Sequence, residues 1–486
     1  MGRVAVCVGG TGMASYELPV HLLNDFTGPD AFDKVAVLAL GVNENTFKGK
    51  SKRPVIPLLG ANLNDAKSIA EALRKCDCTG VTHVYWFLDA NRPPKLANAV
   101  TMRRLMSIGD MCGPVTRAVL DNSPVSVQER VYGQLAYLAG SGSQPRNIDW
   151  LNNMMAALEE VKAPLQNFTM GHGGKHYGMH LGPSLYTGYA TPFEEDVHKC
   201  VGPLSYFEMQ EWVEAKAAEK GFSWNIVRPT FIIGNSPEKT NTTQSFGLVF
   251  AIYAHILKAQ GKPLVFPGSD GAWDCKIQLS TSKKIAHVAA WASTGCASGL
   301  EKHRRDGAKG RAYRNPDGKS VKNQAFNVVS CDEFSWGELW GELAAYFGMA
   351  SGGKPNSRGG QLCIDVMGGQ DAADKTWGEL KAKFGLQDLT FMQVFNADFL
   401  DKSFTATWDS QFSTKKIAKA GYPKDQVLES EPLQIMYEFL DGLQADKLIP
   451  PKPSRASSPR SSKARMGKAG RKVSELPEDE AKSNHA

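Results

Sequence analysis

The sequence predicts an α/β fold: a doubly wound parallel sheet, a smaller C-terminal part that completes the same domain, and a disordered tail. Three observations lead to this prediction. A valine-rich apolar run at the start of the chain ends at a glycine-rich turn. Apolar runs then alternate with amphipathic segments, the order typical of parallel strands joined by helices. After position 451 the composition changes to Ser, Lys, Arg, Pro and Ala, which cannot form a core.

The first strand and the turn after it carry the clearest functional signal. Residues 4–8 form an apolar run, as expected for a strand buried on both faces of a parallel sheet, and a helix is expected at 13–23. The turn between them contains Gly9, Gly10, Thr11 and Gly12. Glycines let backbone N–H groups approach a pyrophosphate closely, and a helix N-terminus favours negative charge. The segment therefore predicts dinucleotide binding of the Rossmann type; an ordinary glycine turn after a buried strand is the alternative.

Two positions depart from the usual pattern of this motif. Ser15 stands where a third glycine is expected, and because serine is small, the helix can still pack closely against the strand. Pro19 removes one helical hydrogen bond and can kink the helix.

The rest of the sheet is expected from apolar runs that recur along the first half. Strands are expected at 34–40, 54–59, 81–88, 165–170 and 224–227, with helices at 68–73, 151–161 and 206–220. Residues 93–146 interrupt this alternation with helical patterns that end in a polar Gly/Ser/Pro stretch, and we treat them as an insertion without an assigned role. Residues 1–237 are therefore expected to form an NAD(P)-binding Rossmann part.

The second half of the chain alternates less regularly. Helices are expected at 244–259, 282–293, 336–347, 377–384 and about 433–443, and strands at 263–266 and 325–329. Ser282 is expected to cap the second of these helices. We expect residues 238–451 to cover the substrate in a cleft of the Rossmann part, and residues 452–486 to be a disordered basic and acidic tail. We expect the basic run of the tail to be solvated. The alternatives are that it binds a nucleic acid or an acidic partner, or that Ser458 is phosphorylated.

Charge, hydropathy and cysteine spacing exclude several classes of function. The tail contains nine Lys/Arg and four Asp/Glu, so it holds +5 of the formal net charge of +6 and leaves no basic body for nucleic acid. No apolar run approaches the ~18 residues of a membrane span, and a strand that begins at once leaves no room for a signal peptide. The nine cysteines are scattered without zinc or redox spacing. We therefore expect a cytoplasmic protein that has no metal site and binds no membrane.

The catalytic residues of short-chain dehydrogenases/reductases, which share this fold class, are not at their usual spacing. Those enzymes carry Tyr-x-x-x-Lys on one helix, where the lysine holds the cofactor ribose and makes the phenol a better acid. None of the 13 tyrosines has a lysine four residues later, and Tyr206 is followed there by Gln210. Either the chain is not catalytic, or the lysine comes from elsewhere.

A series of motifs in matching order resembles the progesterone 5β-reductase/iridoid synthase family, which are atypical extended short-chain reductases. Residues 173–177, Gly-Gly-Lys-His-Tyr, with Leu-Gly-Pro at 181–183, resemble the Thr-Gly-x-Lys-His-Tyr-x-Gly-Pro signature of that family. Further matches lie at 81–92, 191–196, 206–207, 228–237, 261–273, 326–336 and 446–450. The resemblance covers roughly residues 1–450, with gaps.

The resemblance implies a reaction and a site. In that family the lysine of Lys-His-Tyr replaces the missing helix lysine, so Lys175 and Tyr206 correspond to the catalytic pair. The reaction is the 1,4-reduction of the C=C bond of an α,β-unsaturated carbonyl, in which NADPH delivers hydride and the tyrosine stabilises the enolate. NADPH is the implied cofactor, NADH is the alternative, and a homodimer is conceivable. The implied cofactor-binding residues are Gly9, Gly10, Thr11, Gly12, Met13, Asn62, Leu63, Leu88, Pro229 and Ile232.

The chain departs from the family pattern around the cofactor. Leu40 and Gly41 stand where the family has two arginines for the 2′-phosphate of NADP, and the substitutes to consider are Lys48, Lys50, Lys52 and Arg53. Asn62 stands where the family has an acidic residue, and its side chain can still form a hydrogen bond with adenine. Residues 171–173 replace Gln-Thr-Gly, Phe207 replaces the second tyrosine of a pair, and Leu88-Asp89 replace Thr-Trp.

Three functions are compatible with these residues. An enone reductase is the first; a non-catalytic NAD(P)-binding regulator on the same fold is the second. A nucleotide-sugar epimerase or dehydratase comes last, because that chemistry ordinarily needs the absent Tyr-x-x-x-Lys pair. Each of these residues also has a purely structural alternative. Tyr206 could be a core tyrosine and Lys175 a solvated loop lysine. His172 and His176 are expected to be loop histidines rather than metal ligands.

Overall fold

The computed structural model describes residues 2–89, 145–185, 188–200, 204–234, 245–297, 313–314, 321–356 and 360–452. Nearly all of the expected insertion (93–146) and of the disordered tail (452–486) lies outside the described residues, as does the expected boundary at residue 237. Residues up to Lys452 form one compact unit.

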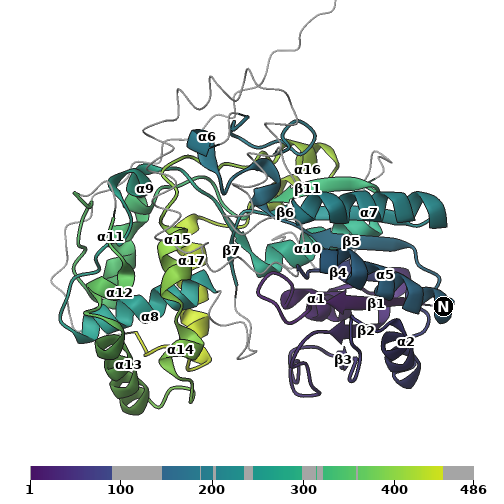
Figure 1. Cartoon of the computed structure of the whole chain (residues 1–486), viewed down its shortest axis with the longest axis horizontal. Coiled ribbons are helices and arrows are strands. Elements are labelled where there is room, and N and C mark those ends of the chain that lie inside the picture. The colour runs from purple at the N-terminus through teal and green to yellow at the C-terminus, as the bar shows by residue number, and fades with distance from the viewer. Residues whose placement is uncertain are drawn as a thin grey trace, which may run out of the picture. The chain divides into compact units, whose positions relative to one another are not determined.

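Seven parallel strands form one sheet in the order β11-β6-β5-β4-β1-β2-β3 (Figure 1). The strands are β1 (Arg3–Val8), β2 (Phe32–Leu38), β3 (Ile56–Pro57), β4 (His83–Trp86), β5 (Asn167–Gly171), β6 (Ser223–Pro229) and β11 (Gln324–Val328). In β1, Ala5 and Cys7 pack into one core and Val6 and Val8 into another, so the strand is buried on both faces as expected. Between β1 and β4 the strand order reverses, and ligands of such sheets bind at the carboxyl ends of the strands at this point.

Helices cover both faces of the sheet, which confirms the doubly wound architecture. On one face lie α1 (Glu17–Asp25) and α10 (Ser282–Thr294), whose apolar side chains share a core with β1 and β2. The other face is covered by α2 (Ala66–Lys75), α5 (Pro145–Glu160) and α7 (Ser205–Lys220) (Figure 1). The short strands β7 (Phe231–Ile233) and β8 (Leu279–Thr281) pair in parallel beyond the end of β6.

A second core surrounds α8 (Phe246–Ala259), and we call it the α8 core. Every residue of α8 from Phe246 to Leu257 is buried. The longer helices around it are α11 (Trp336–Phe347), α13 (Gln370–Phe384), α15 (Ala397–Ser403) and α17 (Pro432–Ala445). The shorter helices are α9 (Asp270–Asp274), α12 (Cys363–Val366) and α14 (Phe391–Val394). Because these helices bury one another, this part needs no sheet of its own.

The expected elements are present with three corrections. The helix expected from residue 13 begins at Glu17, because the N–H of Tyr16 closes a turn onto Gly12 first; Pro19 therefore lies in the first helical turn, where its missing N–H removes no bond. The strand expected at 263–266 is wrong: Leu264 forms only an isolated bridge with Ser351. The side chain that caps α10 is Thr281, which accepts from the N–H of Lys284, and not Ser282.

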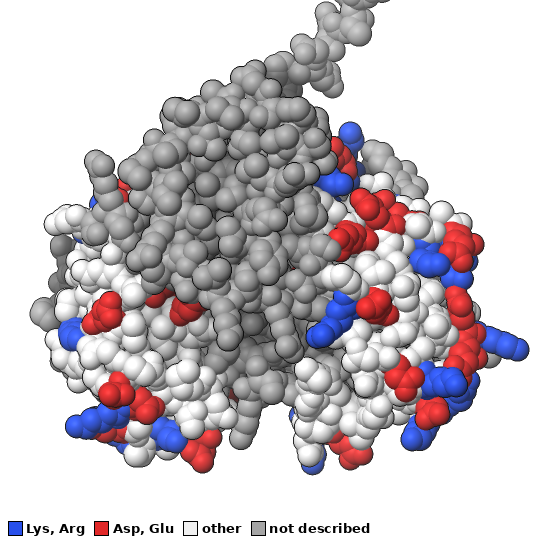
Figure 2. Space-filling view, viewed as in Figure 1, with Lys and Arg blue, Asp and Glu red and all other residues white. Residues whose placement is uncertain are grey.

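The described surface shows no single-sign field on the face drawn in Figure 2, where acidic and basic side chains are interspersed. This distribution agrees with the small net charge expected for the body of the protein. Among the described helices, none has the length and hydropathy that a membrane crossing requires.

Candidate active site

The turn after β1 has a geometry that requires small residues. Gly9 has a φ of 73°, and a Cβ atom on it would lie 2.7 Å from the carbonyl oxygen of Phe87. A Cβ on Gly12 would lie 3.2 Å from the carbonyl oxygen of Gly9. The hydroxyl of Ser15 donates to that same carbonyl at 2.7 Å. The serine at the third glycine position thus ties the start of the helix to the turn.

This turn also offers donors to an anionic group. Within the described part of the chain, the backbone N–H groups of Gly10 and Met13 have no acceptor. The carbonyl of Met13 accepts a hydrogen bond from Ser282 at the start of α10, which fixes the second half of the turn. A cradle of glycines with unpaired N–H groups at the carboxyl end of β1 fits the pyrophosphate of a dinucleotide.

Two residues expected at the adenosine lie beyond β3. Asn62 is exposed, and its side-chain oxygen accepts the backbone and side-chain N–H groups of Asn64, each at 3.0 Å. Leu63 is buried against the face of the sheet that carries α2. The exposed Asn62 can therefore meet a ligand, while Leu63 mainly packs.

The basic residues proposed to replace the arginine pair lie between β2 and β3. Leu40, at the position of the first arginine, is 90 % exposed. The guanidinium of Arg53 donates to the carbonyls of Leu23 and Asp33, each at 3.3 Å. Asp33 is the second residue of β2, so Arg53 lies at the amino end of this strand, opposite the cofactor side. Arg53 is therefore not a substitute for the family arginines.

Tyr206 occupies the first turn of α7 and reaches back to the segment after β5. Its ring stacks on that of His172, with centroids 4.6 Å apart and planes 6° apart. The tyrosine hydroxyl lies 3.5 Å from where a Cβ on Gly173 would be, which is van der Waals contact distance, so Tyr206 lies directly against this segment. Burial raises the pKa of the Tyr206 phenol, and the negative charge of Asp89 raises it further.

Lys175 lies in a short 3-10 helix, Gly174–Tyr177, directly after β5. Its side chain is half-buried, and this burial lowers the pKa of the amine. The charge of Asp89 opposes that shift, whereas the charge of Lys402 on α15 adds to it. Because Lys402 belongs to the C-terminal part, that part contributes to the electrostatics of the site.

Asp89 is the residue that sequence reasoning missed, since it entered only as a departure from the family pattern. It follows β4, and its carboxylate accepts from the Asn147 amide at 2.7 Å and from the Ser205 hydroxyl at 3.3 Å. Its charge acts on both Lys175 and Tyr206. Its place at the carboxyl end of a central strand is the signal that could have identified it.

A buried hydrogen-bond network fixes the segment that carries Lys175. Tyr177 donates to the side-chain oxygen of Asn327 at 2.6 Å and accepts from the guanidinium of Arg228 at 3.2 Å. Arg228 also donates to the carbonyl of Glu195 at 3.2 Å and to Gln210 on α7 at 3.1 Å. This network connects β6, β11 and α7 to the short helix, so it positions Lys175 relative to Tyr206.

The two histidines of this segment are buried rather than solvated. His172 and His176 are 5 % and 3 % exposed, and burial lowers the pKa of each ring, with the charge of Arg228 adding to the effect. Both rings are therefore neutral at physiological pH, and they pack against Tyr206 and Phe207, respectively.

The remaining expected cofactor residues lie at or near the carboxyl ends of the strands. Leu88 is half-buried after β4, and its carbonyl accepts from the indole of Trp86 at 2.8 Å. The carbonyl of Pro229, at the end of β6, lies 3.8 Å from where a Cβ on Gly173 would be. Ile232 is half-buried in β7. Pro229 thus lies beside the same glycine as the Tyr206 hydroxyl.

Comparison with known proteins agrees with this geometry. Residues 135–450 match the family described as PRISE-like Rossmann-fold domain. The chain belongs to this family. The resemblance to 5β-reductase and iridoid synthase found in the sequence is thereby confirmed, and so is the Rossmann fold class.

Three relatives of this PRISE-like protein illustrate the range of similarity. It is 23 % identical over 438 residues to a short chain dehydrogenase, gsfE, of Penicillium aethiopicum, covering 87 % of this chain and 93 % of that one. It is 30 % identical over 204 residues to an (S)-8-oxocitronellyl enol synthase, CYC2, of Camptotheca acuminata, covering 41 % and 45 %. It is 27 % identical over 253 residues to a 3-oxo-Delta(4,5)-steroid 5-beta-reductase of Arabidopsis thaliana, covering 51 % and 56 %. Together with the family, these matches support an oxidoreductase of the extended short-chain dehydrogenase/reductase superfamily.

Proposed function

We propose that this PRISE-like protein catalyses the NAD(P)H-dependent 1,4-reduction of the C=C bond of a small α,β-unsaturated carbonyl compound. The observation that supports the proposal is the contact between the segments that carry Lys175 and Tyr206. The ring of Tyr206 stacks on His172, three residues before Lys175, and the hydroxyl of the neighbouring Ser205 donates to Asp89 at 3.3 Å. Asp89, Lys175 and Tyr206 follow or begin three different elements, β4, β5 and α7, so the fold brings together groups that are distant in the sequence.

Tyr206 is the proposed hydrogen-bond donor to the carbonyl oxygen of the substrate. A nicotinamide cofactor, when bound, supplies the hydride that the β carbon of the enone receives. The oxygen then carries the charge of an enolate, and a donor already aimed at that oxygen is often the largest catalytic contribution. Because its pKa is raised, the Tyr206 phenol keeps its proton at neutral pH and can donate it.

Lys175 is the proposed cation beside this donor. Burial works against its charge, and Asp89 works for it, so the carboxylate helps to keep the amine protonated. An ammonium near the developing enolate stabilises negative charge more strongly than it would in water, because the half-buried site has a lower effective dielectric constant.

We propose NADPH as the preferred cofactor, with NADH as the alternative. The glycine turn with Gly10 and Met13 would hold the pyrophosphate, and the exposed Asn62 would meet the adenine. With Arg53 at the opposite end of β2, the basic residues that remain for a 2′-phosphate are Lys48, Lys50 and Lys52. The ratio of the kcat/KM values for NADPH and NADH measures this preference.

Replacing Tyr206 by phenylalanine tests the proposal. The ring and its stacking on His172 remain, while the hydroxyl is lost. NADPH oxidation is followed with cyclohexenone and methyl vinyl ketone. We expect kcat/KM to fall about 10²-fold or more, the typical effect of removing one such donor. The matched control is Tyr437→Phe, which removes a hydroxyl that donates to the carbonyl of Glu342 on α11, and activity should persist.

Equal rates in the two variants would contradict the proposal. No turnover of any enone by the unaltered protein, together with thermal stabilisation by NADPH, would favour the non-catalytic regulator instead. The observation that favours a non-catalytic regulator is the exposed Leu40, which stands where the family has an arginine.

A further inference from the structure

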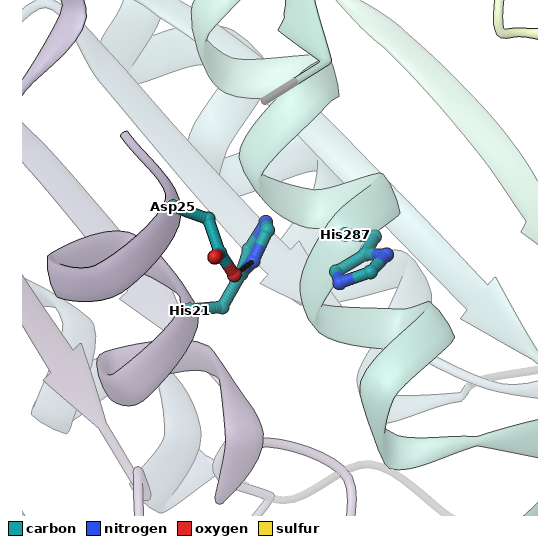
Figure 3. Close-up of side chains that lie close together, drawn as sticks. All are labelled: His21, Asp25 and His287. Carbon is teal, nitrogen blue, oxygen red and sulfur yellow. Dashed lines mark hydrogen bonds and ion pairs between the residues drawn. The ribbon is translucent and has the colours of Figure 1, made fainter. Parts of the chain in front are cut away.

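Two histidines and an aspartate converge between α1 and α10 (Figure 3). These two helices cover the sheet face opposite to the one against which Tyr206 packs. His21 and Asp25 stand one turn apart on α1, and His287 reaches toward them from α10. One ligand atom of each residue lies within 4.8 Å of the ligand atoms of the other two. The three residues, which we call the His-Asp-His cluster, are distant in sequence and adjacent in the fold.

The two histidines of the His-Asp-His cluster are buried in an otherwise apolar helix contact, and Asp25 is half-buried beside them. His21 and His287 are 5 % and 8 % exposed, and their ring centroids are 4.2 Å apart. The Nδ1 atom of His21 lies 2.8 Å from a carboxylate oxygen of Asp25. The surrounding side chains of both helices, such as Leu22 and Ile285, belong to the core of this sheet face. Imidazole and carboxylate are the ligands that Zn²⁺ and related divalent metals prefer in proteins.

A cavity of about 750 Å³ borders the cluster on the side of His287. His287 lines it, and so does Glu17, which stands one turn before His21 on α1. Five carboxylates and two lysines line this cavity, so its charge favours a cation over an anion. Glu17 also interacts electrostatically with His21. The cavity therefore gives room for a water molecule as fourth ligand on the side of His287.

We propose that His21, Asp25 and His287 bind one divalent transition metal ion of the zinc type. The ion joins α1 to α10. These are the two helices that hold the glycine turn, since α1 follows that turn and Ser282 of α10 bonds the carbonyl of Met13. The role is structural, because Tyr206, the proposed donor to the substrate, packs on the other face of the sheet.

Titration of the chelator-treated full-length protein tests the site. We expect Zn²⁺ to bind with 1:1 stoichiometry by calorimetry, and Co²⁺ to give the visible absorption of a nitrogen- and oxygen-ligated ion. Bound Zn²⁺ should raise the melting temperature by about 2 °C or more, since it binds the folded state. Both His287→Gln and Asp25→Asn should weaken binding about tenfold or more, and Asp25→Asn keeps the shape of the side chain. Circular dichroism establishes that each variant is folded; if His287→Gln is not, Asp25→Asn decides.

His255→Gln is the matched control, because His255 is a similarly buried histidine on α8 and should leave binding unchanged. Absence of saturable binding would overturn the proposal, as would equal affinity in the folded Asp25→Asn variant and the unaltered protein. Loss of binding in Cys76→Ser instead would assign the ion to the Cys76–Cys78 segment and overturn the site as well.

Discussion

The site around Asp89, Lys175 and Tyr206 and the α8 core are built in opposite ways. At the site, polar groups from the ends of several strands and helices are half-buried, and burial works against the charged forms of Lys175 and Tyr206. The α8 core is made almost entirely of apolar side chains, and helix α8 at its centre is buried on every side. The difference teaches that the first region keeps polar groups where their charged forms are disfavoured, as the proposed chemistry requires, while the second provides stability.

The largest effect is expected in the α8 core. Phe250 is fully buried and packs on Trp340 and Phe347, with ring centroids 5.6 and 5.9 Å away. Phe250→Ala should lower the free energy of unfolding by about 3–5 kcal/mol, because it leaves a cavity in a rigid environment. Denaturant unfolding measures the loss. The control is Met392→Ala, an exposed position that should change stability by less than about 0.5 kcal/mol.

If Phe250→Ala left the free energy of unfolding unchanged, the α8 core would not be the region that provides stability, and its contrast with the candidate site would be lost. The variant should keep the kcat/KM of the unaltered protein at a temperature where it stays folded, since Phe250 packs in the α8 core, which includes neither Lys175 nor Tyr206. A matching loss of activity under those conditions would show that the α8 core also shapes the site.

The next effect concerns Lys175 and has opposite signs for activity and stability. Lys175→Met should reduce kcat/KM about 10²-fold, since a buried cation near the enolate is lost. The pKa of Lys175 is lower in the folded than in the unfolded state, so the unfolded state binds the proton more tightly and folding stability rises as pH increases toward 10.5. The uncharged methionine avoids this penalty, and the free energy of unfolding at pH 7 should not fall.

Loss of both activity and stability in Lys175→Met would contradict the interpretation that burial of this amine disfavours its charged form in the folded protein. Lys381 of α13, which is half-buried and pairs with Asp388, offers a comparison, because Lys381→Met should leave activity unchanged.

Much of the sheet could be predicted because the period of apolar residues and the spacing of turn residues are properties of short sequence segments. The apolar run at 4–8 and the helix expected at 206–220 correspond to β1 and α7 within two residues at either end. The strand expected at 263–266 failed because an apolar run can be buried by helices as well as by a strand ladder. The four-residue helices α12 and α14 are too short to show a period of 3.6 residues.

The candidate site could be predicted only as far as motifs reach. Lys175 and Tyr206 were identified through the resemblance to a family, and their roles stay predictions. Asp89 was missed because it matters through the convergence of strand ends, which no local pattern encodes. The same holds for His21 and His287, which lie on two helices that the fold packs together.

A smaller effect is expected from Asp89, the carboxylate whose charge acts on both residues of the proposed catalytic pair. Asp89 raises the pKa values of Lys175 and Tyr206, so Asp89→Asn should lower both. The alkaline limb of the pH–rate profile should therefore move to lower pH, and kcat should fall about tenfold. The asparagine can still accept the hydrogen bond from Asn147. An unshifted limb, or the same shift in the exposed Asp149→Asn control, would show that Asp89 is only structural.

The smallest effect is expected at the amino end of the sheet. If ligands meet only the carboxyl ends of the strands, Arg53→Ala should change the ratio of kcat/KM for NADPH and NADH by less than about twofold. The guanidinium of Arg53 bonds the carbonyls of Leu23 and Asp33, so its loss should be felt in stability, by about 0.5–1.5 kcal/mol. Lys48→Ala provides the comparison, because Lys48 is exposed on the loop that follows β2. A tenfold drop in the ratio for Arg53→Ala would mean that the segment between β2 and β3 rearranges to meet the 2′-phosphate, and the two ends of the sheet would then not be functionally distinct.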